Sequence, residues 1–127
     1  IEGKFRADCN AYDGKVLVTG QAENKTIIDQ VVSAVRSIDG VKAIYNRMTI
    51  GPNNSSSGIA DDIEISGKVV AALLEADGVS KLHVRIFTES RVTYLMGRVS
   101  QSEANIAIQV TKSVEGVEKV DSLLTIQ

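Results

Sequence analysis

The chain has 127 residues, of which 43% are hydrophobic, 24% charged and 4% aromatic, and its net charge is −2. These values are typical of one ordinary globular domain or two very small ones with an aliphatic core. The charge gives no argument for nucleic acid binding, and a single cysteine excludes an intramolecular disulfide. No stretch approaches the roughly 20 apolar residues that a bilayer-spanning helix needs.

The first part of the chain predicts two strands, a helix and a third strand. Asp13-Gly14 separates two short apolar runs and is a strong hairpin signal. Asn24 is a suitable N-cap for a helix with apolar positions at helical spacing, and Gly40 is suited to end it. The expected elements are strands at residues 6–12, 15–20 and 41–50 and a helix at residues 25–38.

Residues 51–58 consist of Gly, Pro, Asn and Ser and contain the only proline. Such a composition has nothing to bury and is typical of a linker. We therefore expect a first domain at residues 1–50, a linker at 51–58 and a second domain at 59–127.

The second part of the chain predicts a helix and then the same order of elements as the first part. Asp61-Asp62 places acidic side chains at the start of the helix, where the helix dipole favours them. Ser100 and Glu103 have the spacing of a capping box. The expected elements are helices at residues 62–76 and 101–114 and strands at residues 84–88, 92–97 and 117–126.

The two parts are copies of one β-β-α-β unit. Gly20 matches Gly97 at an offset of 77 residues, and Gly40-Val41 matches Gly116-Val117 at an offset of 76. Only the second copy is preceded by a helix, so we expect the first copy to lack its N-terminal helix through truncation. The expected fold is α+β, with two units that each have a three-stranded mixed sheet and helices on one face.

The repeated strand–turn–strand–Gly, helix, Gly-Val and strand frame resembles the BON domain, a small bacterial envelope module. The string from Ala11 to Gln21 and the string from Tyr94 to Gly97 resemble, within that family, the dual-BON outer-membrane lipoproteins of the YraP/DolP type. The resemblance covers residues 4–126. One departure is Arg91, which stands where the pattern has glycine, so we expect a turn other than the tight Asp-Gly kind.

The resemblance implies a non-catalytic periplasmic protein that maintains envelope integrity. It also implies an outer-membrane anchor on a lipidated cysteine upstream of Ile1. It further implies that one BON domain contacts anionic phospholipid, and it implies no cofactor.

The residues that carry catalytic or metal chemistry elsewhere do not form a recognisable pattern here. His83 is the only histidine, and Cys9, on the inner face of its strand between Ala7 and Ala11, is expected to be a buried, inert thiol. Asp61, Asp62 and Glu64 lack the spacing of a calcium-binding loop. We expect no catalytic residue, no metal site and no cofactor.

The helix at residues 62–76 has two apolar stripes, although a helix on a small sheet needs one. The second stripe contains Ile63, Gly67, Val70 and Leu74, and we expect it, with Lys68, to form a lipid or partner surface. Its alternatives are packing on the other BON domain, packing on another subunit, and ordinary scattered exposure. An anionic-lipid site would need local clustering of the basic residues Lys68, Lys81 and Arg85.

The second sheet is expected to have an apolar outer face. Strand alternation places Phe87, Val92, Tyr94 and Leu123 on the side away from the helices. An apolar face of this kind is typically covered. We therefore expect a domain interface or a homo-oligomer at these four residues.

Overall fold

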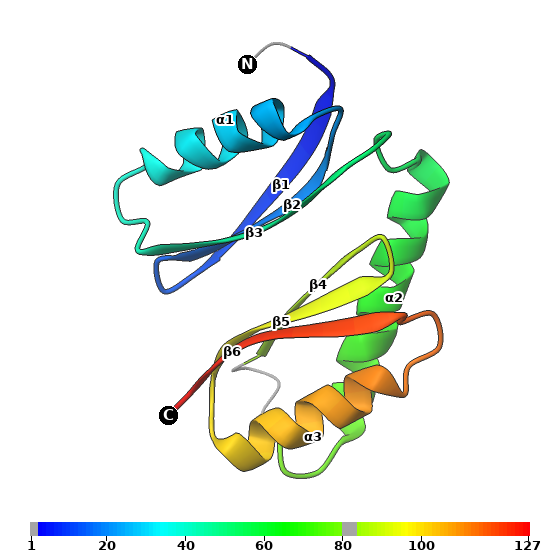
Figure 1. Cartoon of the computed structure of the whole chain (residues 1–127). Helices are drawn as coiled ribbons and strands as arrows, with labels where there is room; N and C mark the ends of the chain where they lie inside the picture. Colours follow the sequence, from blue (N-terminus) through cyan, green and yellow to red (C-terminus); the bar gives the residue numbers. More distant parts are fainter. Residues whose placement is uncertain (1–2, 80–83) are drawn as a thin grey trace. The chain divides into compact units, whose positions relative to one another are not determined.

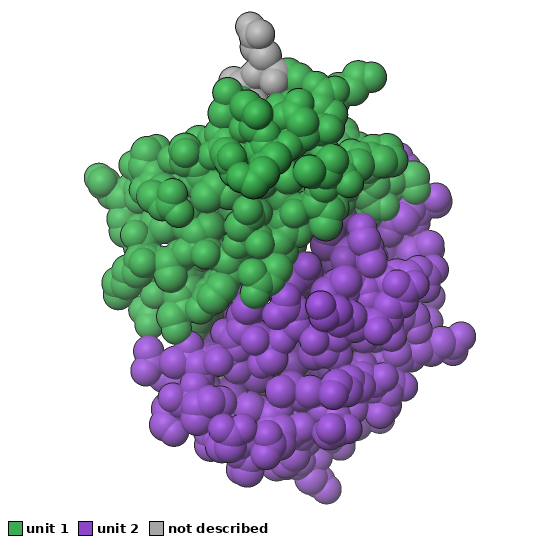
Figure 2. Space-filling view, in the orientation of Figure 1, with its two compact units in different colours: residues 1–55 green, residues 56–127 purple. Residues whose placement is uncertain are grey.

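The computed structural model of the chain describes residues 3–79 and 84–127 (Figure 1). The chain divides into two compact units, residues 1–55 and residues 56–127, which Figure 2 colours separately. The first unit contains β1 (Phe5–Tyr12), β2 (Lys15–Ala22), α1 (Lys25–Arg36) and β3 (Ala43–Ile50). The second contains α2 (Ser56–Glu75), β4 (Val84–Glu89), β5 (Val92–Val99), α3 (Gln101–Lys112) and β6 (Lys119–Ile126).

Each unit has one three-stranded mixed sheet. In the first, β2 is central, antiparallel to β1 and parallel to β3. In the second, β5 has the same place between β4 and β6. The parallel pair is joined by a crossover helix in both units, as parallel strands require (Figure 1). The predicted α+β fold of two mixed-sheet units is confirmed.

Local signals in the sequence explain where the helices begin. Asn24 has an extended backbone, and its side-chain oxygen accepts a hydrogen bond from the Ile27 N–H at 3.0 Å. The Ser100 hydroxyl accepts from the Glu103 N–H at 3.2 Å, and the Glu103 carboxylate accepts from the Ser100 N–H at 3.0 Å. The predicted capping box is confirmed.

The cores are aliphatic and lie between sheet and helices. In the first unit, Ile28, Val31 and Val35 of α1 pack against Val16 and Val18 of β2. In the second unit, two helices cover the sheet. Helix α2 packs on β4 and on α3, and α3 packs on β5 and β6. Their core side chains include Ile65, Val69 and Leu73 from α2 and Ala104 and Ala107 from α3.

The expected linker end is wrong, because α2 begins at Ser56 and residues 56–58 are helical. The linker was predicted from the low helix propensity of Ser56, Ser57 and Gly58, without regard to tertiary packing. A single glycine costs a helix about 1 kcal/mol, which a 20-residue helix that packs on β4 and α3 tolerates. Residues 51–55 are therefore the part of the expected linker that is not helical.

The prediction for the second hairpin is also wrong. Ser90 and Arg91 form a two-residue turn between Glu89 and Val92, and both have positive φ, 49° and 64°. Asp13-Gly14 has the same left-handed geometry in the first unit, with φ of 51° and 79°. A non-glycine residue adopts this conformation at a cost of about 1–2 kcal/mol, and the second hairpin has a compensating contact from α2.

That contact is made by the buried carboxylate of Asp62. One of its oxygens accepts a hydrogen bond from the Ser90 N–H at 2.8 Å, and the other accepts from the Arg91 N–H at 3.0 Å. Hydrogen bonds to an ionised carboxylate are about twice as strong as neutral ones. Asp62 therefore holds the turn in a geometry that the first unit obtains from glycine.

Candidate functional site

Cys9 and His83 are the two side chains of the sequence with candidate nucleophilic chemistry. Cys9 is exposed, so the prediction of a buried thiol is wrong. The sequence placed it correctly on the inner face, opposite Val18, but α1 packs on β2 and β3. Partial burial, and then the negative charge of Asp8, raise the pKa of the Cys9 thiol, which keeps thiolate scarce at neutral pH. His83 lies outside the described residues.

The acidic side chains at the start of the predicted helix make structural contacts. Asp62 binds the β4–β5 turn, the Asp61 carboxylate lies 3.7 Å from the Arg91 guanidinium, and the Glu64 carboxylate lies 3.5 Å from the Lys68 ammonium. Within residues 3–79 and 84–127, no three His, Cys, Asp or Glu side chains gather as metal ligands. In the same ranges, no helix is long and apolar enough to cross a membrane.

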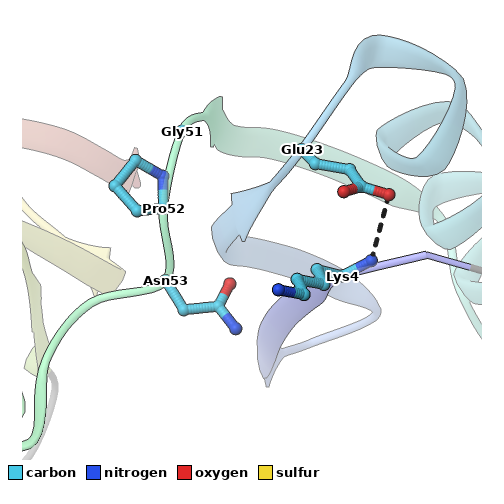
Figure 3. A pocket seen from close by; sticks show the side chains of 5 residues that line it. All are labelled: Lys4, Glu23, Gly51, Pro52 and Asn53. Atoms are coloured by element: carbon cyan, nitrogen blue, oxygen red, sulfur yellow. Dashed lines mark hydrogen bonds between the residues drawn. The ribbon is translucent and has the colours of Figure 1, made fainter.

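A pocket in the first unit is shallow and open (Figure 3). The Glu23 carboxylate, on one wall, accepts a hydrogen bond from the Lys4 main-chain N–H at 3.3 Å. The Asn53 amide and the Lys4 side chain point toward one another across it, and Gly51 and Pro52 complete the lining. Ligand sites are usually enclosed, mostly apolar cavities with a few polar groups directed inward, and this pocket lacks that enclosure.

The α2 stripe, which we define as Ile63, Gly67, Val70 and Leu74, lies on the surface as predicted. Ile63, Val70 and Leu74 are 68%, 42% and 51% exposed, and a Cβ added at Gly67 would meet open space. At 100° per residue the four positions fall within an arc of about 60° and extend along about 16 Å of helix. The opposite side of α2 carries the buried core residues, so the helix has two apolar sides.

The charged residues of α2 are mostly negative. Helix α2 contains four acidic residues and one basic residue, Lys68, which forms an ion pair with Glu64. Arg85 is exposed on β4, and Lys81 lies outside the described residues. The expected role of these three basic residues at a lipid surface stays a prediction.

The four residues expected on the outer sheet face share one side of the second sheet. Phe87 on β4 pairs with Tyr94 on β5, and Leu123 on β6 pairs with Met96 on β5. Val92 lies on the same side, two residues before Tyr94. Tyr94 and Leu123 are buried, whereas Phe87 and Val92 are half-buried. Their assignment to a domain or oligomer interface stays a prediction.

Met96, which was not predicted from the sequence, belongs to the same face and is buried. Its place on this face was predictable, because residues two positions apart in a strand, such as Tyr94 and Met96, point to the same side of the sheet. Asp62 was also missed as a turn ligand. Its contacts with residues 90 and 91 depend on tertiary structure, so no local pattern could have indicated them.

The structure thus defines a class: a tandem pair of small α+β units whose distinctive feature is an exposed apolar helix stripe. The family model of the BON domain matches residues 5–52 and 61–127. The chain belongs to the BON-domain family and carries two copies of the domain, as the sequence predicted.

Three curated proteins are similar to this chain over most of its length. The outer membrane lipoprotein DolP of Haemophilus influenzae is 29% identical over 120 residues, and the 21 kDa hemolysin of Actinobacillus pleuropneumoniae is 31% identical over 120 residues. Each match covers 94% of this chain and 62% of the relative. Osmotically-inducible protein Y of Escherichia coli is 28% identical over 108 residues, with coverage of 83% and 54%. The chain thus spans less than two thirds of these relatives.

Among solved structures, CdsD, a structural protein of the type III secretion system of Chlamydia trachomatis, covers 97% of this chain and 85% of its own at 10% identity. Its TM-score of 0.44 is too low to support any functional argument.

Proposed function

We propose that this chain is a non-catalytic envelope protein on the periplasmic side of the outer membrane, where it supports envelope integrity by binding phospholipid through the α2 stripe. The names of the relatives support the location, since one is an outer membrane lipoprotein. The proposal includes a lipid anchor upstream of Ile1, as the family resemblance implies.

The α2 stripe is the observation that carries the binding proposal. Three of its side chains are large, apolar and exposed, on a helix whose other side already fills the core of the second unit. Removing such a side chain from water contributes about 1.5–3 kcal/mol. A surface of this kind fits the boundary between lipid headgroups and acyl chains.

The charge distribution indicates whether apolar contact or electrostatic attraction contributes more to lipid binding. Lys68 is the one basic residue of α2, and Glu64 offsets its charge. We therefore expect apolar contact to contribute more than attraction to anionic lipid, and salt to change binding by less than a purely electrostatic contact would.

Liposome flotation tests this proposal. Vesicles of phosphatidylcholine alone, and of phosphatidylcholine mixed equally with phosphatidylglycerol, are compared with the wild type and with the double variant Ile63→Ser, Leu74→Ser. The wild type is expected to float with both vesicles, and the variant is expected to lose most binding. Ile38→Ser is the matched control, because it removes another exposed isoleucine outside α2. A folded wild type that binds neither vesicle would refute phospholipid binding.

The alternative is a structural homo-oligomer, built through the outer sheet face and the α2 stripe, without direct lipid binding. Half-buried Phe87 and Val92 support it. Light scattering tests this alternative. A monodisperse monomer at high concentration would exclude it, and Phe87→Asp should dissociate any oligomer that uses the sheet face.

A further inference from the structure

Strand β6 is an edge strand, so one side of its backbone meets no other strand among the described residues (Figure 1). The Gln127 N–H, directly after the strand, donates to the Val99 carbonyl oxygen on β5 at 2.9 Å. Because backbone groups alternate in direction along a strand, the odd-numbered residues of β6 bond to β5 and the even-numbered residues point their N–H and C=O groups away from the sheet. The outward-pointing residues are Val120, Ser122, Leu124 and Ile126.

Strand β3 has the equivalent place in the first unit, and its own side chains close the matching edge. Met48 and Leu124 both face the glycine of the central strand, which aligns β3 with β6. The Asn46 side-chain oxygen accepts a hydrogen bond from the Met48 N–H at 3.1 Å, and the Arg47 guanidinium donates to the Asn46 carbonyl oxygen at 3.4 Å. Edge strands that are blocked in such ways resist pairing with another chain.

Strand β6 lacks both of these side chains. Ser122 and Leu123 occupy the positions that match Asn46 and Arg47. Leucine has no hydrogen-bond donor, and the exposed Ser122 hydroxyl makes no hydrogen bond among the described residues. The middle of the β6 edge therefore keeps a donor at Leu124 and an acceptor at Ser122 that β3 does not offer.

We propose that β6 pairs antiparallel with β6 of a second copy of this chain, which joins the second sheets of the two copies into one continuous sheet across a two-fold axis. The interface is the strand edge. It is independent of lipid binding through the α2 stripe and of an oligomer through the outer sheet face.

The sequence of β6 is complementary to itself in the register that uses all the outward-pointing residues. Val120 then faces Ile126 of the second copy and Ser122 faces Leu124, so that each facing pair exchanges two hydrogen bonds. On the other face of the sheet, Leu123 meets Leu123 of the second copy. Ile126, which is 45% exposed in the single chain, gains an apolar neighbour.

The charges of β6 favour the same register. Asp121 faces Thr125 of the second copy, so no like charges are opposed. A slip that places Asp121 opposite Asp121 brings two carboxylates together, and a slip that places Ile126 opposite Glu118 leaves an apolar side chain beside a charge. Charge and apolar contact thus select one pairing of the two strands.

The expected assembly is a weak, closed dimer. Each β6 edge is used once, so the two-fold pairing does not extend to further copies. A single pair of short strands covers less than the roughly 1,200–2,000 Å² of a stable interface. The dimer should therefore form and dissociate with concentration.

Hydrogen exchange tests the proposal on the wild-type chain. Amide exchange is followed by NMR at concentrations from about 50 μM to about 1 mM, a range suited to a weak interface, and sedimentation velocity measures the dimer in the same samples. Exchange at Ser122 and Leu124 is expected to slow at least about threefold as the dimer forms. Exchange at Leu123, which donates to β5, is expected to stay constant.

Three substitutions at Ser122 form a matched series. Ser122→Pro removes an outward N–H without removing a hydrogen bond to β5, so it is expected to abolish the dimer. Ser122→Asn copies Asn46 of β3, and its side chain is expected to occupy the Leu124 N–H and weaken the dimer. Ser122→Ala keeps the N–H and is the control that should dimerise like the wild type. Circular dichroism checks that all three remain folded.

Two results would overturn the proposal. One is a wild type that stays monomeric at about 1 mM, which is concentrated enough to populate even a weak interface. The other is a dimer in which exchange at Ser122 and Leu124 does not change, since that would assign the interface to another surface. If Ser122→Pro unfolds, the wild-type exchange pattern and Ser122→Asn still decide.

Discussion

At the scale of single residues, Asp62 is the side chain with the clearest structural role. We expect Asp62→Ala to lower the free energy of unfolding by about 2–4 kcal/mol, because two N–H groups of a turn with positive φ lose a buried carboxylate acceptor. Urea denaturation measures this change. Asp61→Ala is the control, since Asp61 is exposed and its carboxylate lies 3.7 Å from the Arg91 guanidinium. An exposed ion pair of this kind is worth less than about 1 kcal/mol.

The left-handed conformation of Arg91 provides a second test of this prediction. Arg91→Gly removes the cost of a left-handed arginine, so we expect it to recover part of the stability lost in Asp62→Ala. An Asp62→Ala variant as stable as Asp61→Ala would show that the turn needs no acceptor on α2.

At the scale of elements, α2 is a helix with one structural side and one side free for binding. Leu73 and Leu74 are adjacent, but Leu73 is 2% exposed in the core and Leu74 belongs to the α2 stripe. We expect Leu73→Ala to lower the free energy of unfolding by about 2–5 kcal/mol and Leu74→Ala to change it by less than about 0.5 kcal/mol. Chemical denaturation of both variants checks this. A large loss in Leu74→Ala would mean that the stripe is part of the folded core.

Features that depend on residues close together in the sequence were predictable, whereas features that depend on tertiary contacts were not. The hairpin Asp13-Gly14, the N-cap Asn24 and the Ser100–Glu103 capping box depend on residues within a few positions of each other, and all three are confirmed. Alternation likewise placed Cys9 on the correct face. Its exposure depends on whether a helix covers that face, which is a property of distant chain segments. The α2 stripe was predictable because helical periodicity separates two apolar sides.

At the scale of the whole molecule, the two units differ in how completely their sheets are covered. The second unit has helices over all three strands, whereas the first has one helix and an open β1. Domains below about 70–80 residues rarely gain more than about 3–5 kcal/mol from one core. Loss of one covered strand is therefore a large fraction of the stability available to the first unit.

We accordingly expect residues 56–127, produced alone, to fold and unfold cooperatively, because their core is assembled from their own strands and helices. Residues 1–55 alone should be markedly less stable, since Cys9 and Ala11 on the inner face of β1 stay exposed to water. Amide chemical-shift dispersion and urea denaturation of the two fragments measure the difference. Equal stability of both fragments would mean that an uncovered β1 costs the first unit little.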